Sequence, residues 1–300
     1  IFVASIGAVA PFLAVRPAWT QQPGRMVRIG VLSSFGANDR ERYEPMIEAL
    51  RERGYVEGRN VSFEYRYADG DSALVARHAA DLVRVPVDLI VAIATPAGHA
   101  AKAATQTIPV IFTVADALAT GLVTNLARPG GNLTGISNLA ADLAGKQLEL
   151  LREIIPGASR IAFLGSLQDP NTRTFRQQSE AATAQLGIAL ETLLVADPAG
   201  FEGAFAAAVA ARAAAMIVQP IFVSDRARIG ELALRHRLPW IGDYGEFATA
   251  GALLAYGADR AWLFRRLGIQ VARALEGTPP GDMPVEQPTR FNLIVNLRAA

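Results

Sequence analysis

The chain has 300 residues, 51% of them hydrophobic and 19% charged, which is enough apolar material for two domains of ordinary size. Its 29 basic and 28 acidic residues give a net charge of +1, so we expect no nucleic-acid partner, which would need a clustered basic excess. Because the sequence contains no cysteine, we expect no disulfide, no thiolate metal site and no cysteine nucleophile.

Residues 1–20 are typical of a secretory signal peptide. Arg16 is the only charged residue between Ile1 and Ala18, and small residues near Ala18–Thr20 fit a cleavage zone. The same apolar run also fits an uncleaved membrane anchor, which stays open as the alternative. We expect export to the periplasm without a lipid anchor, since that anchor would need a cysteine.

From residue 27 onward, short apolar runs alternate with stretches of helical spacing. Strands are expected near 27–33, 61–67, 88–94, 109–113 and 132–137. Helices are expected near 39–54, 72–85, 97–106 and 117–127. The segment ARPGGN is typical of a turn, because Pro129 fixes φ and two permissive glycines follow it.

A second series of the same kind begins near Asp142. Its helices are expected near 144–156, 171–186, 199–211, 225–236 and 259–276, the first of them stopped by Pro156. Its strands are expected near 160–165, 188–194, 215–219, 238–242, 251–257 and 290–297.

Strands that alternate with helices predict an α/β fold, here two doubly wound parallel-sheet lobes. The N-terminal lobe is assigned residues 27–134 and 251–285, and the C-terminal lobe residues 135–250 and 286–300. Three crossings between the lobes, near 134–137, 247–253 and 284–290, predict a hinge. Ligands of such sheets bind beyond the carboxyl ends of the strands, so we seek the site in the loops that follow strands.

In the first lobe, loops after three strands offer groups to a ligand. Thr95 and Ala97 lie where a strand gives way to a helix, whose free N–H groups suit a carboxylate, although Thr95 also fits a simple N-cap. Ser33 and Ser34 follow the first strand and either donate to a ligand or begin a turn. Asp116 can receive an ammonium group or cap the following helix.

In the second lobe, three loops hold candidates that face the first set. Gln168 and Asn171 follow its first strand, although Asn171 also fits a helix cap. Phe222 can stack on a ligand ring or belong to the core. Asp243 and Tyr244 follow the strand at 238–242, and Asp243 is the alternative partner for an ammonium group.

Known catalytic and cofactor motifs are absent from the sequence. The segment PGGN precedes a strand instead of a helix, and AGKQ lacks the glycine and the Ser/Thr of a phosphate loop. Neither Gly-x-Ser-x-Gly nor His-Glu-x-x-His occurs, and the three histidines are not at metal-ligand spacing. We therefore expect a protein that is not an enzyme and that carries no cofactor and no metal.

Several long stretches resemble one family. They are RIGVL, LRERGYVEGRNVSFEYRYADGD, DLIVAIATPAGHAAKAATQTIPVIF, LARPGGNLTGIS and DMPVEQPTRFNLIVNL, in an order that covers nearly everything from Arg25 to Leu297. On these motifs the chain resembles the ABC-transporter substrate-binding proteins of the tryptophan/tyrosine-binding type, which have the type I periplasmic binding fold. The resemblance implies that the loop at Thr95 takes the α-carboxylate of an amino acid.

The same resemblance implies a receptor that closes on a small ligand and delivers it to the permease subunits of an ABC transporter. The expected ligand is an amino acid or a related small carboxylate, and we expect the protein to be a monomer. Two other functions stay open. One is an α/β enzyme that acts on a small carboxylate, and the other is a ligand-sensing regulator of the same fold.

Overall fold

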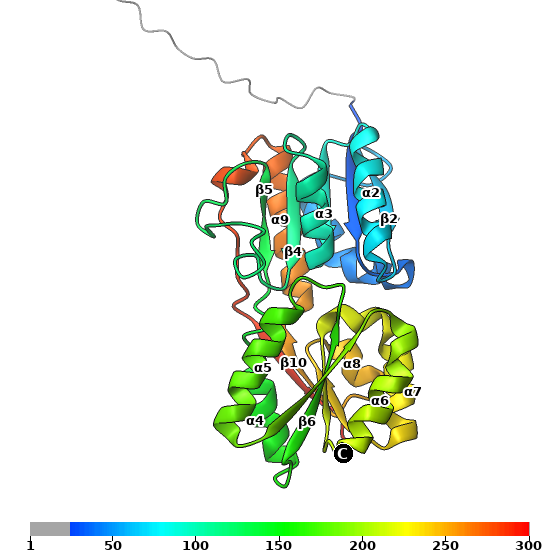
Figure 1. Ribbon diagram of the computed structural model, residues 1–300. Helices are drawn as coiled ribbons and strands as arrows, with labels where there is room; N and C mark the ends of the chain where they lie inside the picture. Colours follow the sequence, from blue (N-terminus) through cyan, green and yellow to red (C-terminus); the bar gives the residue numbers. More distant parts are fainter. Residues whose placement is uncertain (1–24, 300) are drawn as a thin grey trace, which may run out of the picture.

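The computed structural model describes residues 25–299, so the leader predicted at 1–20 lies outside the described residues. The described chain forms two α/β lobes, one above the other in Figure 1, each built on its own sheet. The prediction of two α/β lobes is therefore confirmed. Among residues 25–299, none of the helices combines the length and the apolar character that a membrane span needs.

The first lobe has a five-stranded parallel sheet in the order β2-β1-β3-β4-β5. Its strands are β1 (Val27–Ser33), β2 (Val61–Tyr67), β3 (Leu89–Ile93), β4 (Val110–Val114) and β5 (Leu133–Ser137). Its helical segments are η1 (Ala37–Tyr43), α1 (Glu44–Glu52), α2 (Ser72–Arg84), α3 (Thr95–Ala104), α9 (Arg260–Leu275) and η4 (Pro280–Asp282).

The alternation of side chains along each strand explains how helices cover both faces of this sheet. Ile29 and Val31 of β1 belong to the core with α1 and α9, whereas Leu32 belongs to the core with α2 and α3. Every residue of β3 and β4 is buried, as expected for central strands covered on both faces.

The second lobe has a six-stranded sheet in the order β11-β10-β9-β8-β6-β7. Its strands are β6 (Arg160–Ser166), β7 (Ala189–Val195), β8 (Met216–Val218), β9 (Trp240–Gly242), β10 (Leu254–Ala258) and β11 (Phe291–Val295). Its helical segments are α4 (Ala144–Ile154), α5 (Thr172–Leu186), η2 (Pro198–Gly200), α6 (Phe201–Ala210), η3 (Pro220–Asp225), α7 (Arg226–His236) and α8 (Gly245–Thr249). The sheet is not wholly parallel, because β11 runs antiparallel to β10.

The boundary predicted at residue 251 is wrong for one strand. β10 was expected in the N-terminal lobe, but it pairs with β9 and β11 and so belongs to the second sheet. The chain returns to the first lobe only at α9, which packs on α1. The second crossing therefore lies near Asp259, after β10, instead of near 247–253. An apolar run gives no sign of which sheet it will join.

The helix expected at 117–127 does not form. Residues 115–124 make a single turn and irregular loops, and Gly121 has a φ of +70°, which ends the turn. The carboxylate of Asp116 accepts hydrogen bonds from the N–H groups of Leu118 and Ala119 and stabilises that turn without a helix behind it.

Candidate functional site

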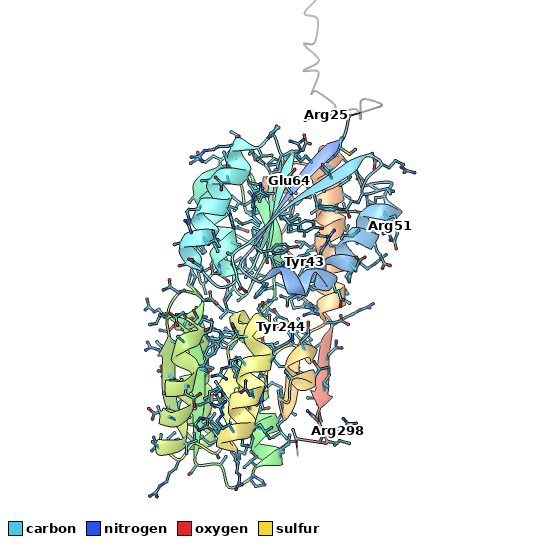
Figure 2. All side chains as sticks on the ribbon, turned by 90° about the vertical axis from the view of Figure 1, so that its right-hand side faces the viewer. Arg25, Tyr43, Arg51, Glu64, Tyr244 and Arg298 are labelled. Atoms are coloured by element: carbon cyan, nitrogen blue, oxygen red, sulfur yellow. The ribbon has the colours of Figure 1, made fainter. Side chains whose placement is uncertain are left out.

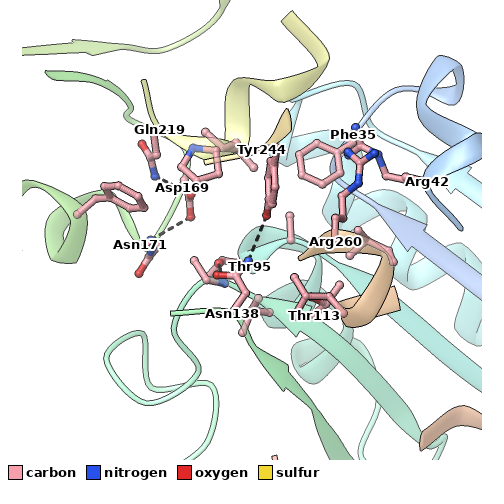
Figure 3. A pocket seen from close by; sticks show the side chains of 18 of the residues that line it. Phe35, Arg42, Thr95, Thr113, Asn138, Asp169, Asn171, Gln219, Tyr244 and Arg260 are labelled. Atoms are coloured by element: carbon pink, nitrogen blue, oxygen red, sulfur yellow. Dashed lines mark hydrogen bonds between the residues drawn. The ribbon is translucent and has the colours of Figure 1, made fainter. Parts of the chain in front are cut away.

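A partly open cavity lies between the lobes and is lined by residues of both. Its lining combines residues that follow strands in both sheets, among them Thr95 and Asp169, with residues of η1 and α9; Figure 3 labels several of them. In Figure 2, Tyr43 lies at the lower edge of the upper lobe and Tyr244 at the upper edge of the lower lobe, where the two lobes face each other.

Thr95 forms part of the first-lobe wall at the start of α3. Its hydroxyl oxygen accepts a hydrogen bond from the N–H of Ala115 at 3.3 Å, which leaves the hydroxyl proton to be donated elsewhere. The preceding Ala94 has a φ of +77°, an unfavourable value for a residue with a Cβ. No side chain caps α3, and because Pro96 has no N–H, Thr95 and Ala97 are the residues whose N–H groups the helix start can offer to an anion.

Asp169 forms part of the second-lobe wall and is 8% exposed. Its Oδ1 accepts a hydrogen bond from the N–H of Asn171 at 2.9 Å, and its Oδ2 accepts one from Nε2 of Gln219 at 2.7 Å. Burial raises the pKa of the Asp169 carboxyl to about 6, against the effect of these two hydrogen bonds. The group is therefore ionised at neutral pH but protonated in mild acid.

Asn171 lines the same wall and is fully buried. Within residues 25–299 neither its Oδ1 nor its Nδ2 has a hydrogen-bond partner. Buried amides normally have partners, because an unsatisfied polar group loses its hydration without replacement. The side chain is thus a donor and an acceptor that the protein itself leaves unused.

Aromatic rings and two guanidinium groups occupy the other side of the cavity (Figure 3). Arg42 lies over the ring of Phe35 at 4.5 Å, and Arg260 lies 5.9 Å from the ring centre of Tyr244. Arg260 also forms an ion pair with Glu246. This side of the cavity therefore carries positive charge and planar rings, whereas the wall at Asp169 carries a negative charge.

Hydrogen bonds join the lobes beside the cavity. Nδ2 of Asn138 donates to the hydroxyl of Tyr244 at 3.2 Å, and burial raises the pKa of that phenol to about 12. Ser72 donates to Oε1 of Gln168 at 2.8 Å, and the N–H of Gly36 donates to Oγ of Ser224 at 3.4 Å. The described arrangement is therefore one in which the lobes touch.

Three of the predicted site residues, Thr95, Asn171 and Tyr244, come together in the wall of this cavity. Gln168 lies outside the lining and joins the lobes through Ser72 instead. Ala97 is fully buried in the core beside α2 and β4.

Ser33 and Phe222 have side-chain partners within their own lobes, whereas the buried hydroxyl of Ser34 has none among residues 25–299. Oγ of Ser33 accepts from the Tyr43 hydroxyl at 2.9 Å and from the N–H of Phe35 at 3.1 Å. Ser34 is buried outside the lining. Phe222 packs edge-on against Phe201 at 5.0 Å.

The two carboxylates expected to meet an ammonium group do not line this cavity. Asp116 caps a turn. Asp243 accepts a hydrogen bond from Nε2 of Gln147 at 2.9 Å and lines a second cavity beside Asn292. Burial raises the pKa of Asp243 to about 8. Both residues are close in sequence to the site, but the chain turns their carboxylates away from it.

Sequence reasoning missed several lining residues: Phe35, Arg42, Asn138, Asp169, Gln219 and Arg260. Asp169 lies between two residues that were predicted, and Gln219 begins the loop in which Phe222 was chosen. The loops after strands were thus the right signal for these two. Arg42 and Arg260 come from helical segments, for which that signal says nothing.

Among residues 25–299 no group of three or more metal-ligating side chains is placed to hold an ion.

Comparison with known proteins points to ligand binding. The curated Tyrosine-binding protein of Clostridioides difficile (strain R20291) is 28% identical over 259 residues, which cover 83% of this chain and 72% of that protein.

Two solved structures share the two-lobe fold. A conserved domain protein from Vibrio cholerae has a TM-score of 0.86 and 27% identity, covering 92% of this chain and 94% of that one. The structure of an ABC domain in complex with L-Trp from Streptococcus pneumonia has a TM-score of 0.85 and 26% identity, covering 92% and 93%. The sequence profile described as ABC transporter substrate binding protein matches residues 29–300. Because that match covers most of the sequence, the chain belongs to the ABC transporter substrate-binding protein family.

Proposed function

We propose that this protein is the receptor of an ABC transporter and that it binds an aromatic amino acid between its lobes. The observation that carries the proposal is the inter-lobe cavity, which combines the rings of Phe35 and Tyr244 with polar groups on its walls. The names of two similar proteins, a tyrosine-binding protein and a structure in complex with L-Trp, support the same ligand class.

The carboxylate of the ligand binds at Thr95 and the first turn of α3. The Thr95 hydroxyl has a proton to donate, since its oxygen already accepts from Ala115. The helix start adds N–H groups and a partial positive charge, both favourable for an anion. Arg42 adds a positive charge to the same cavity.

The side chain of the ligand packs among the apolar groups of the cavity, which include Phe35, Ile221, Tyr244 and Phe264. A flat aromatic side chain gains most from such surroundings, because ring pairs contribute about 0.5–1.5 kcal/mol beyond the area that they bury.

Binding works by shifting an equilibrium between open and closed lobes, with no bond broken. The ligand contacts both walls only when the lobes touch, so it stabilises that arrangement, and permease subunits recognise it. We further propose that the apolar leader exports the protein and that a single protomer is sufficient for binding.

Native mass spectrometry of the purified protein, followed by thermal-shift measurements with the amino acids, tests this function. L-tryptophan or L-tyrosine should raise Tm, since ligand at about 100 times its Kd stabilises by about 2.7 kcal/mol. Mass spectrometry should also recover the bound ligand unchanged. Stabilisation by a neutral sugar alone, or chemical conversion of the amino acid, would refute the proposal.

A further inference from the structure

The carboxylate of Asp169 is held in one orientation by groups that can only donate to it. Gln219 cannot turn its amide around, because its Oε1 accepts from the backbone N–H of Ser166 at 2.9 Å, and an NH2 group in that place would face another donor. Its Nε2 therefore always faces Oδ2 of Asp169. The second donor, at Oδ1, is a backbone N–H and is equally fixed.

Part of this carboxylate is left for a ligand. A carboxylate can accept about four hydrogen bonds. Within residues 25–299 Asp169 accepts two, one on each oxygen. Asp169 lines the cavity, so the unused capacity of both oxygens is at the wall of the site (Figure 3).

The neighbouring Asn171 gives an independent sign that something binds here. Its amide is fully buried, lines the cavity and has no hydrogen-bond partner among the described residues. A buried amide with both ends unsatisfied is costly, and a polar ligand that supplies partners removes that cost. The two side chains together offer carboxylate and amide oxygens as acceptors and the Nδ2 group of Asn171 as a donor.

The charges around the cavity fix the sign of that group. Arg42 and Arg260 are the guanidinium groups of its lining, and both lie against the aromatic rings. Asp169 is the one carboxylate among the described lining residues, on the opposite wall. A group bound at Asp169 gains most if it is positive and carries several N–H donors.

We propose that Asp169 binds the ammonium group of the ligand, that Asn171 adds a hydrogen bond to it, and that Gln219 is the positioning residue that holds Asp169. This assignment rests on the proposed function and makes a free amine a requirement for tight binding. It replaces both carboxylates predicted from the sequence, Asp116 and Asp243, with Asp169.

The test compares L-tryptophan with 3-(indol-3-yl)propionate, which lacks only the amine, by calorimetry at neutral pH. The wild-type protein should bind L-tryptophan about tenfold or more tightly than the analogue, since a charge-assisted contact is lost. In Asp169→Asn this preference should fall to near unity. Asp197→Asn is the matched control, because Asp197 is exposed and caps η2 in the same lobe, and it should keep the full preference.

A second measurement on wild-type protein covers the case in which Asp169→Asn folds poorly. The preference for L-tryptophan should shrink as pH falls from about 7 to about 5, because protonated Asp169 no longer attracts an ammonium group. Arg42 and Arg260 keep their charge over this range, and Tyr244 stays neutral.

The outcomes separate the two proposals. If amino acids bind but the analogue binds equally well, or if Asp169→Asn keeps the preference, the assignment of Asp169 is wrong and the proposed function stands. A preference that does not change with pH would equally overturn the assignment. If no amino acid binds to the wild-type protein, both proposals fail.

Discussion

The Thr95 hydroxyl is expected to donate to the ligand, and it also accepts a hydrogen bond from the N–H of Ala115. One substitution removes both interactions, and two measurements tell their effects apart. In Thr95→Val the shape is kept, but the hydroxyl is lost, so we expect affinity for L-tryptophan to fall by about tenfold or more. The N–H of Ala115 also loses its acceptor, which should lower stability by about 1–3 kcal/mol. Calorimetry and thermal denaturation measure the two effects.

Thr183→Val is the control for this substitution. Thr183 is buried in α5, and its hydroxyl donates to the carbonyl of Ser179 within the helix, away from the cavity. This variant should bind L-tryptophan with wild-type affinity. Unchanged affinity in Thr95→Val would show that the ligand carboxylate binds elsewhere.

Asp243 makes stability depend on pH in a direction opposite to that of most carboxylates. Burial raises its pKa to about 8, whereas an unfolded Asp titrates near 4. Between these values the native state keeps a proton that the unfolded chain releases. The stabilisation is therefore complete below about pH 4 and is lost as pH rises through about 8.

Asp243→Asn lacks this titrating proton, so its stability relative to wild type should rise between about pH 4 and about pH 8. The slope should reach at most about 1.4 kcal/mol per pH unit. The raised pKa of Asp169 acts in the same way in both proteins and cancels in the difference. Thermal denaturation at several pH values measures this, and a difference that stays constant with pH would contradict it.

The loops that form the site could be predicted from the sequence, but the individual residues that line the cavity could be predicted only in part. The loop after β6 was identified, yet Gln168 points across to Ser72 while Asp169, the next residue, lines the cavity. Successive residues of an irregular loop point in different directions, and no periodicity reports which one faces a ligand. Asp116 shows the same limit, because its position after a strand was right and its carboxylate is used in a turn.

At the scale of elements, the contact between α9 and α1 is what ties the returning chain to the first lobe. A Cβ on Gly268 of α9 would lie 2.5 Å from the carbonyl oxygen of Met46 and 2.9 Å from Cβ of Ala49. We expect Gly268→Ala to lower stability by about 1–3 kcal/mol, because the two backbones must separate. Chemical denaturation measures the change.

Gly203→Ala provides the matched control in another helix. A Cβ on Gly203 of α6 would meet nothing within 4 Å, so the substitution should stabilise by about 0.5–1 kcal/mol through helix propensity alone. If Gly268→Ala were equally stabilising, the close packing of α9 on α1 would be wrong.

Most elements could be predicted because their signals are local. The buried strand β3 was expected at 88–94 and lies at Leu89–Ile93, and α2 was expected at 72–85 and lies at Ser72–Arg84. The helix expected at 117–127 failed because a capped turn satisfied the same polar groups. β10 belongs to the second sheet because it pairs with β9. That pairing depends on the whole fold, so the residues of the strand alone do not predict it.

At the scale of the whole molecule, contacts between the lobes stabilise the closed arrangement. Gln168→Ala removes the acceptor for Ser72 and should weaken L-tryptophan binding by about two- to tenfold without touching the cavity, since a hydrogen bond contributes about 0.5–1.5 kcal/mol net. Ser72→Ala should have the same effect, and the double variant should lose no more than either. Gln178→Ala, an exposed position on α5, should bind as wild type does.

We propose that the two lobes close on an aromatic amino acid. Small-angle scattering of the protein with and without saturating L-tryptophan tests it most directly, because opening about a hinge changes the radius of gyration while each lobe keeps its shape. We expect a larger radius of gyration without ligand and a decrease when L-tryptophan is added. A radius of gyration that stays the same at saturating L-tryptophan would contradict it.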